Sequence, residues 1–215
     1  VAIITRDAAL DGSLDVPADA IGLVLFAHGS GSSRHSPRNR YVAQVLNDAK
    51  IGTLLFDLLT SEEGERDAID RSLRFDIELL AARVIDAIDW ISEQAELDEL
   101  PLGLFGASTG AAAALVAAAA RPRRVAAVVS RGGRPDLADA ALHLVCAPTL
   151  LLVGGRDPEV LALNQSARQR MLGTVSISIV DGATHLFEQP GALEEVASRA
   201  AAFFRKQLAL GPEPQ

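Results

Sequence analysis

The sequence predicts an α/β fold built on a mostly parallel, doubly wound sheet of about eight strands. Short apolar segments alternate with longer amphipathic ones along the whole chain. The apolar segments lack the strict polar alternation of a half-exposed sheet, which indicates strands covered on both faces. No repeat with a period of roughly 20–50 residues interrupts this order, so solenoids and propellers are excluded.

The expected elements follow one another in a regular order. The first is an antiparallel edge hairpin within residues 1–20, with Asp11-Gly12 as its turn. Six buried strands come next: Ile21–His28, Thr53–Leu58, Leu102–Ala107, Val125–Ser130, Thr149–Gly154 and Val175–Asp181. Helices are expected at Pro37–Lys50, Arg74–Gln94, Thr109–Ala120, Pro158–Arg170 and Gly191–Leu208. We expect a single domain over residues 1–210 and a loose tail at 211–215.

Composition excludes several classes of protein. The 215 residues are 49% hydrophobic and 22% charged, as in globular proteins and unlike disordered ones. A formal charge of −8 argues against a nucleic-acid partner. The apolar stretch Ala111–Ala120 is far shorter than the roughly 20 residues of a membrane helix. One cysteine, Cys146, cannot form an internal disulfide, which favours a reducing compartment, so we expect a cytoplasmic protein. We also expect a monomer or homodimer without a membrane partner.

The pentapeptide Gly106-Ala107-Ser108-Thr109-Gly110 lies between an expected strand and an alanine-rich helix. In that setting the pattern G-x-S-x-G is typical of a tight turn that exposes a nucleophilic serine. Its small residues allow the turn to be sharp. The alternative is that Ser108 is an ordinary N-cap of the helix.

A serine hydroxyl needs a histidine to take its proton and an acid to orient that histidine. Asp157 and His185 each follow a later strand, at the carboxyl edge where functional groups gather in parallel sheets. We therefore expect Ser108, Asp157 and His185 to form a catalytic triad. Asp157 also precedes Pro158 and fits a helix N-cap, and we rank it above Asp57 as the acid.

The loop His28–Arg34 follows the first parallel strand and contains Gly29-Ser30-Gly31. At this position a backbone amide can help to stabilise the oxyanion, together with the amide after the nucleophile. We assign these amides to Ser30 and Thr109, with Gly31 as a nearby alternative. A nucleotide-binding loop is the weaker interpretation, because the glycine pattern is incomplete.

Together, the segments HGSGSSRHSPRNRY, GASTG, GGRD and GATH resemble a small α/β-hydrolase of the dienelactone-hydrolase-like family, over nearly the whole chain. The resemblance implies the α/β-hydrolase fold and an esterase that needs no cofactor. It departs from dienelactone hydrolase proper, whose nucleophile is cysteine where this chain has Ser108. Cys146 precedes a strand and is expected to be a small buried hydrophobe. We therefore expect a serine hydrolase that cleaves a small carboxylic ester, thioester or lactone through an acyl-enzyme.

The substrate contacts are predicted from the loops around the site. Only a short helix near Leu137–Leu144 occupies the place of a lid domain, so we expect an open site suited to short acyl groups. Arginines follow the two strands beside the expected nucleophile, which favours an anionic substrate. We name Gly31, Arg34, His35 and Arg131 as candidate contacts. Alternatively, Arg34 and Arg38 pair with Asp57 or Glu62 and only brace the loops.

Two further interpretations concern the four histidines and the class of function. The histidines lack the spacing of metal ligands, so we expect no metal. A non-catalytic binding or interaction module on a hydrolase scaffold is the alternative to an enzyme. The presence of all three triad side chains and the small-residue turn favours the enzyme. The sequence leaves the identity of the substrate open.

Overall fold

A computed structural model describes residues 1–210 of the chain; the expected tail at 211–215 lies outside the described residues. Eight strands form one sheet in the order β1-β2-β4-β3-β5-β6-β7-β8. Their bounds are β1 (Ala2–Ile4), β2 (Ala9–Asp15), β3 (Leu23–Ala27), β4 (Gly52–Phe56), β5 (Leu102–Ala107), β6 (Val125–Arg131), β7 (Thr149–Gly154) and β8 (Val175–Val180). The six strands β3 to β8 are parallel to one another, whereas β1 and β2 add an antiparallel edge beside β4. The expected sheet is therefore confirmed.

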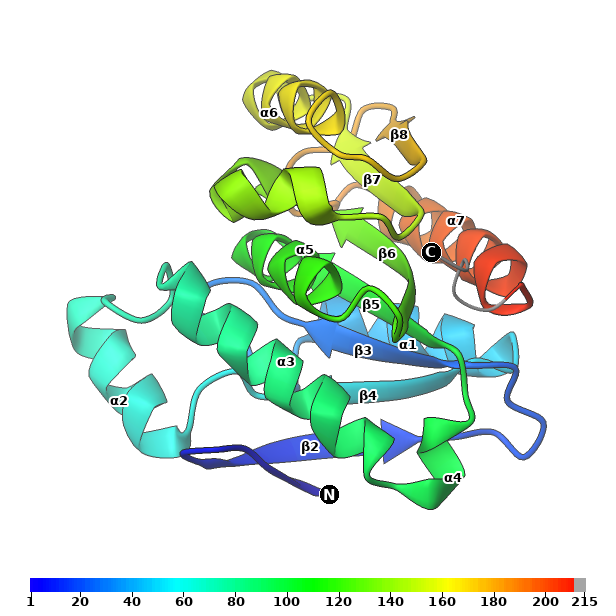
Figure 1. Cartoon of the computed structure of the whole chain (residues 1–215). Helices are drawn as coiled ribbons and strands as arrows, with labels where there is room; N and C mark the ends of the chain where they lie inside the picture. Colours follow the sequence, from blue (N-terminus) through cyan, green and yellow to red (C-terminus); the bar gives the residue numbers. More distant parts are fainter. Residues whose placement is uncertain (211–215) are drawn as a thin grey trace.

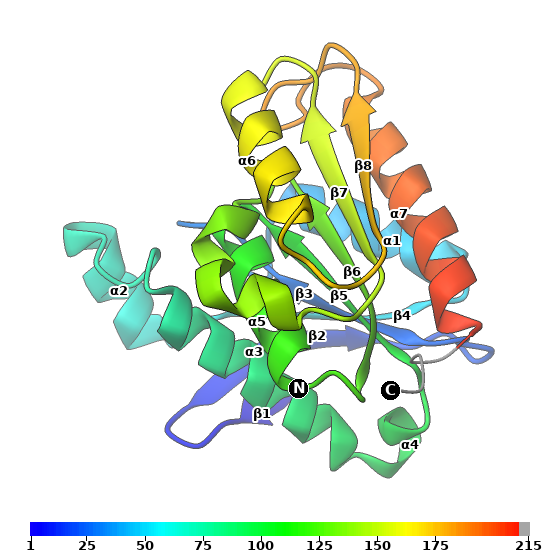
Figure 2. The same cartoon turned by 45° about the horizontal axis from the view of Figure 1, so that its top comes forward.

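Helices cover both faces of the sheet (Figure 1, Figure 2). They are α1 (Pro37–Asp48), α2 (Ser61–Asp70), α3 (Ile77–Ser92), α4 (Ala95–Asp98), α5 (Thr109–Ala120), the 3-10 helix η1 (Pro135–Leu144), α6 (Pro158–Arg168) and α7 (Ala192–Leu208). One face carries α1 and α7, and the other carries α3, α5 and α6 (Figure 2). None of the helices in residues 1–210 is both long and apolar enough to cross a bilayer.

Each face of the sheet has its own hydrophobic layer. Strand side chains alternate between the two: Leu25 packs with the α3–α5 layer, and Phe26 packs with the α1–α7 layer. Helix α5 is buried on almost all sides, because it lies between α3 and η1 over the centre of the sheet (Figure 1). Its alanines suit this position, since small side chains let neighbouring elements approach closely.

The N-terminal hairpin differs from the expectation in its turn. Asp11 and Gly12 lie inside β2 rather than at a bend, and the chain reverses between Thr5 and Ala8, where the Thr5 amide donates to the Ala8 carbonyl at 2.8 Å. Gly12 is needed for packing instead. A Cβ there would lie 3.2 Å from a methyl carbon of Leu54. The predicted turn at Asp11-Gly12 was therefore wrong.

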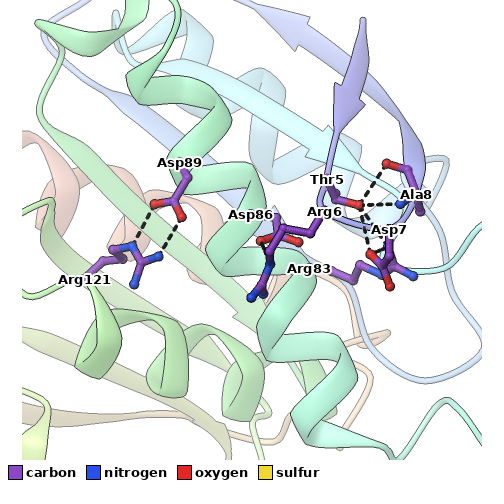
Figure 3. A network of polar contacts seen from close by, with 8 residues as sticks. All are labelled: Thr5, Arg6, Asp7, Ala8, Arg83, Asp86, Asp89 and Arg121. Carbon is purple, nitrogen blue, oxygen red and sulfur yellow. Dashed lines mark hydrogen bonds and ion pairs between the residues drawn. The ribbon is translucent and has the colours of Figure 1, made fainter.

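Helix α2 was not expected from the sequence, because it is strongly charged and has almost no apolar face. A capping box starts it: the Thr60 side chain accepts from the Glu63 amide, and Glu63 accepts from the Thr60 amide. The buried guanidinium of Arg83 on α3 bonds to Glu63 and also to Asp7 in the hairpin turn. Figure 3 shows Arg83 beside Asp7, with Asp89 of α3 bonded to Arg121 further along. Ion pairs thus tie α2 and the hairpin to the domain.

The register of the sheet decides which loops become neighbours. Ala27 at the end of β3 pairs with Gly106 of β5, and Ala107 pairs with Arg131 of β6. The loops that follow β3, β5 and β6 therefore leave the sheet side by side. Those after β7 and β8 emerge at the same carboxyl edge.

Candidate active site

The chain turns sharply from β5 into α5 at Ser108. This residue has φ 51° and ψ −121°, a left-handed backbone that costs about 1–3 kcal/mol for a residue with a Cβ. Small neighbours make the turn possible: a Cβ on Gly106 would lie 2.4 Å from the Cα of Ala111, and one on Gly110 would lie 2.3 Å from the Ala27 carbonyl oxygen. Ser108 occupies the N-cap position, yet its side chain makes no capping hydrogen bond. The hydroxyl is therefore not used for the helix.

A hydrogen bond joins Asp157 and His185. Nδ1 of His185 lies 2.8 Å from Oδ2 of Asp157. Because a carboxylate only accepts, Nδ1 carries a proton, and Nε2 is the nitrogen that can accept one. Asp157 stands at the N-cap of α6, but its carboxylate does not cap that helix. Its side chain is 16% exposed and that of His185 is 39% exposed, so the carboxylate lies behind the imidazole.

Ser108 and His185 line the same cavity, which has a volume of about 200 Å³. Their side chains are not hydrogen-bonded to each other in the part of the chain that the structure describes. Gly132, just after β6, lies beneath the imidazole: a Cβ there would lie 3.0 Å from the His185 carbonyl oxygen and 3.6 Å from its Cε1. Gly132 also has φ +50°. Only glycine therefore lets the His185 loop approach the end of β6 this closely without strain.

The loop after β3 lies directly against the turn at Ser108. A Cβ on Gly29 would lie 3.1 Å from the Cβ of Ser108. The hydroxyls of Ser30 and Thr109 are hydrogen-bonded to each other at 3.0 Å. Within residues 1–210, the backbone amides of Ser30 and Thr109 donate to no acceptor of the protein. The Thr109 amide belongs to the first turn of α5, where helix geometry leaves it unpaired. Two free N–H groups thus flank the serine.

His28 fixes the loop that carries Ser30. Its Nε2 accepts from the Leu58 amide at 3.1 Å, so Nδ1 carries the proton and donates to the Gly29 carbonyl at 3.0 Å. Burial lowers the pKa of His28, against the opposing influence of the Gly29 hydrogen bond and of the charge on Asp57. A neutral His28 therefore ties the loops after β3 and β4 together.

Two of the candidate substrate contacts lie elsewhere. The Arg34 amide donates to Oδ1 of Asp57 at 2.7 Å, and its guanidinium pairs with the same carboxylate and with Asp11. Arg34 and the exposed His35 line a groove beside α1 rather than the cavity of Ser108. The structure thus gives Arg34 the bracing role considered as the alternative. Because Arg34 is bonded to Asp57, that carboxylate is used in the loop. Asp157 is the acid that is hydrogen-bonded to His185.

Gly31 borders a second and larger cavity of about 310 Å³. This cavity lies between the loop after β3 and helix α2, and Leu58, Thr60 and Arg74 contribute to its walls. Gly31 has φ +66°, and a Cβ there would lie 3.2 Å from an Nη atom of Arg74. The two cavities meet at Ser30, which lines both.

Arg131 is the predicted contact that the structure places beside Ser108. It lines the 200 Å³ cavity and is only 8% exposed. Its Nη2 donates to Oδ1 of Asn39 at 3.2 Å. Burial, together with the positive charge of Arg38, lowers the pKa of Arg131 to about 10. A cationic side chain is therefore held in a place that disfavours its charge.

No cluster suited to a metal ion is found in residues 1–210: nowhere do three or more His, Cys, Asp or Glu side chains gather closely enough. The ring nitrogens of His28 are bonded to the backbone, and Nδ1 of His185 is bonded to Asp157.

The model of the alpha/beta hydrolase domain matches residues 20–202 of the sequence, which covers every strand from β3 to β8. The chain belongs to the alpha/beta hydrolase family. The chain is also 56% identical over 214 residues to a Mycobacterium tuberculosis protein named provisionally as a phosphoribosyl transferase, found in strains CDC 1551 and H37Rv. The match includes 100% of this chain but 47% of that protein, so the chain spans about half the length of the curated relatives.

Solved structures agree with this membership. The crystal structure of a dienelactone hydrolase from Anabaena variabilis is 55% identical, with a TM-score of 0.95 over 96% of both chains. The structure of Est1E from Butyrivibrio proteoclasticus, with ferulic acid bound, is 16% identical with a TM-score of 0.81, over 97% of this chain and 99% of its own. At that identity the likeness to Est1E shows the fold alone.

Sequence reasoning overlooked three residues of this chain that shape the site. Gly132 was part of a Gly-Gly pair after a strand, a signal of close backbone approach that was available. His28 was noted only as the residue before a glycine. Asn39 carried no signal, because its bond to Arg131 joins residues 92 positions apart.

Proposed function

We propose that this alpha/beta hydrolase cleaves a small carboxylic ester, thioester or lactone through a covalent acyl-enzyme on Ser108. The observation that carries the proposal is one arrangement of three side chains. Ser108, held at a left-handed φ, shares a 200 Å³ cavity with an imidazole whose Nδ1 is bonded to Asp157. The two oxygen-bearing side chains stand at helix N-caps without capping them, which forgoes about 1 kcal/mol at each helix. Such a loss is expected where side chains serve chemistry.

The reaction then follows from the positions of the groups. Oγ of Ser108 attacks the carbonyl carbon while Nε2 of His185 takes the hydroxyl proton, and Asp157 stabilises the resulting imidazolium. The carbonyl oxygen becomes an oxyanion that accepts from the amides of Ser30 and Thr109. When this intermediate collapses, the alcohol or thiol leaves with the proton from His185. Water, deprotonated by His185, attacks the acyl-enzyme, and the acid is released with Ser108 regenerated.

The shape of the site favours small substrates. The cavities of about 200 and 310 Å³ meet at Ser30, which gives separate space for the two sides of an ester bond. Only the 3-10 helix η1 stands where a lid domain would be inserted, so little apolar surface is available to a long acyl chain. The name of the 55% identical relative, dienelactone hydrolase, supports ester and lactone chemistry as well.

Two other interpretations have weaker support. A non-catalytic binding module would have no need for the strained Ser108 together with the bond between Asp157 and His185. The transferase name belongs to proteins of which this chain matches 47%, and the matched part is a hydrolase domain.

A panel of short esters tests the proposal. We expect acetate-to-butyrate aryl esters, thioesters and small lactones to be hydrolysed by the wild type. The Ser108→Ala variant should lose at least ~10³-fold in kcat, since the nucleophile is gone. Thr109→Ser is the matched control, because it keeps a backbone amide and a hydroxyl beside the nucleophile. Equal rates for wild type and Ser108→Ala would overturn the proposal.

A further inference from the structure

Within the part of the chain that the structure describes, the guanidinium of Arg131 is buried without a carboxylate. There it donates one hydrogen bond, to the amide oxygen of Asn39, and its Nε has no partner. Among the ion pairs of residues 1–210, none includes Arg131. An uncompensated buried charge is costly, so such a group is normally paired or replaced by an apolar one.

A second cation lies beside it rather than an anion. Arg38, near the start of α1, lines the same cavity, and its positive charge acts on Arg131. Its Nε is likewise buried without a partner, and its Nη1 lies 3.6 Å from the largely exposed carboxylate of Glu188. The guanidinium groups of Arg131 and Arg38 therefore line the same cavity. Within residues 1–210, the exposed Glu188 is the one acid paired with Arg38.

Three other arginines around the site are paired with acids. Arg34 pairs with Asp57, Arg74 with Asp67, and Arg134 with Asp136. Bracing of loops thus accounts for these three side chains. It does not account for Arg131, whose charge raises the free energy of the empty site.

The surroundings of Arg131 suit a small oxyanion. Ser32 and Ser36 also line the cavity and add hydroxyl donors. Ser36 is the N-cap of α1, a twelve-residue helix whose N-terminus carries partial positive charge. Guanidinium groups bind carboxylates and phosphates through paired hydrogen bonds, so such a ligand would compensate the buried charge.

We propose that Arg131 and Arg38 form an anion-binding subsite beside Ser108, which holds a carboxylate or phosphate that the substrate carries close to its ester carbonyl. As a statement about substrates, it rests on the proposed function. The volume of about 200 Å³ that Arg131 shares with Ser108 sets the limit on size. A half ester of a short dicarboxylic acid fits this limit, with its free carboxylate on the guanidinium groups and its ester carbonyl at Ser108.

Binding of the anion alone can be measured without any hydrolysis. Succinate and inorganic phosphate are titrated separately into the Ser108→Ala protein by calorimetry. We expect one site, whose affinity falls about 10- to 100-fold when Arg131→Gln is added and less for Arg38→Gln. Arg134→Gln is the matched control, because it removes a rim charge that Asp136 already pairs. The stronger of the two anions identifies the group that the substrate carries.

Kinetics then relate the subsite to the reaction. In wild type, kcat/KM for an aryl monosuccinate should exceed that for the equally long aryl butyrate, and Arg131→Gln should abolish this preference. If Arg131→Gln does not fold, Arg38→Gln is expected to reduce the preference in the same direction. Absence of anion binding, or binding that survives both arginine substitutions, would overturn the inference even if esters are hydrolysed. Arginine-dependent binding without any hydrolysis would leave the subsite in place and overturn only the proposed function.

Discussion

The amide nitrogen of Ser108 donates a hydrogen bond of 3.3 Å to the carbonyl oxygen of Arg131. One backbone contact therefore joins the nucleophile proposed here to the residue proposed to hold the anion. The Arg134 amide in turn donates to the Ser108 carbonyl at 3.1 Å. Because Ser108 is bonded to the last residue of β6 and to the segment that follows it, the backbone around β6 sets the distance between nucleophile and subsite.

The identity of the triad acid can be tested with two matched substitutions. Asp157→Asn should lower kcat by ~10³- to 10⁴-fold, because an asparagine cannot hold His185 in the required tautomer or stabilise its charged form. Asp57→Asn removes the partner of Arg34 and should reduce the free energy of unfolding by ~1–3 kcal/mol, with a much smaller effect on kcat. Steady-state kinetics and urea unfolding of both variants check this. A larger loss of kcat in Asp57→Asn would reverse the assignment.

The approach of His185 depends on Gly132. Gly132→Ala should lower kcat by about 100-fold, since the added Cβ at 3.0 Å from the His185 carbonyl displaces the imidazole. Gly182→Ala is the control: Gly182 has φ +71° but nothing within 4 Å of its position for a Cβ. Both substitutions carry a backbone cost of ~1 kcal/mol, and only Gly132→Ala should affect catalysis. Equal kcat values would show that Gly132 does not position the histidine.

Stability should depend on pH through His28. Its pKa is lowered in the folded protein, so between that value and the ordinary 6.5 the unfolded chain binds more protons. The free energy of unfolding is unaffected by His28 above about pH 7 and decreases as the pH falls through 6.5, by up to ~1.4 kcal/mol per pH unit. We expect urea unfolding from about pH 7.5 to pH 5 to show a shallower decrease in His28→Gln than in wild type.

The exposed His35 provides the comparison for this experiment. His35→Gln is the control for replacing a histidine with glutamine, because the His35 side chain is exposed. If His28→Gln and wild type lose stability in parallel between pH 6.5 and about 5, the neutral buried state assigned to His28 is incorrect.

The parallel sheet could be predicted because each buried strand is an apolar run long enough to recognise by itself. The positions of Ser108, Asp157 and His185 followed from the rule that side chains after parallel strands meet at one edge. The turn at Asp11-Gly12 was wrong because the role of Gly12 depends on contact with Leu54, a residue distant in sequence. Local pattern carries no information about such a contact.

The arginines near the site also depend on contacts that the local sequence does not show. Sequence placed Arg34 and Arg131 near the expected nucleophile with equal weight. Asp57 then pairs with Arg34, whereas no acid within residues 1–210 pairs with Arg131, and only the assembled fold decides between these outcomes. Helix α2 was overlooked for a related reason, since its stability depends on the capping box at Thr60 and on Arg83 rather than on an apolar face.

The central claim is that Ser108 is an activated nucleophile, and covalent labelling tests it most directly. A fluorophosphonate incubated with the native protein should add one mass to the peptide that contains Ser108, and His185→Ala should slow this reaction by at least ~10³-fold. Labelling of another serine, such as one in the loop after β3, or a rate unchanged by His185→Ala, would contradict the account.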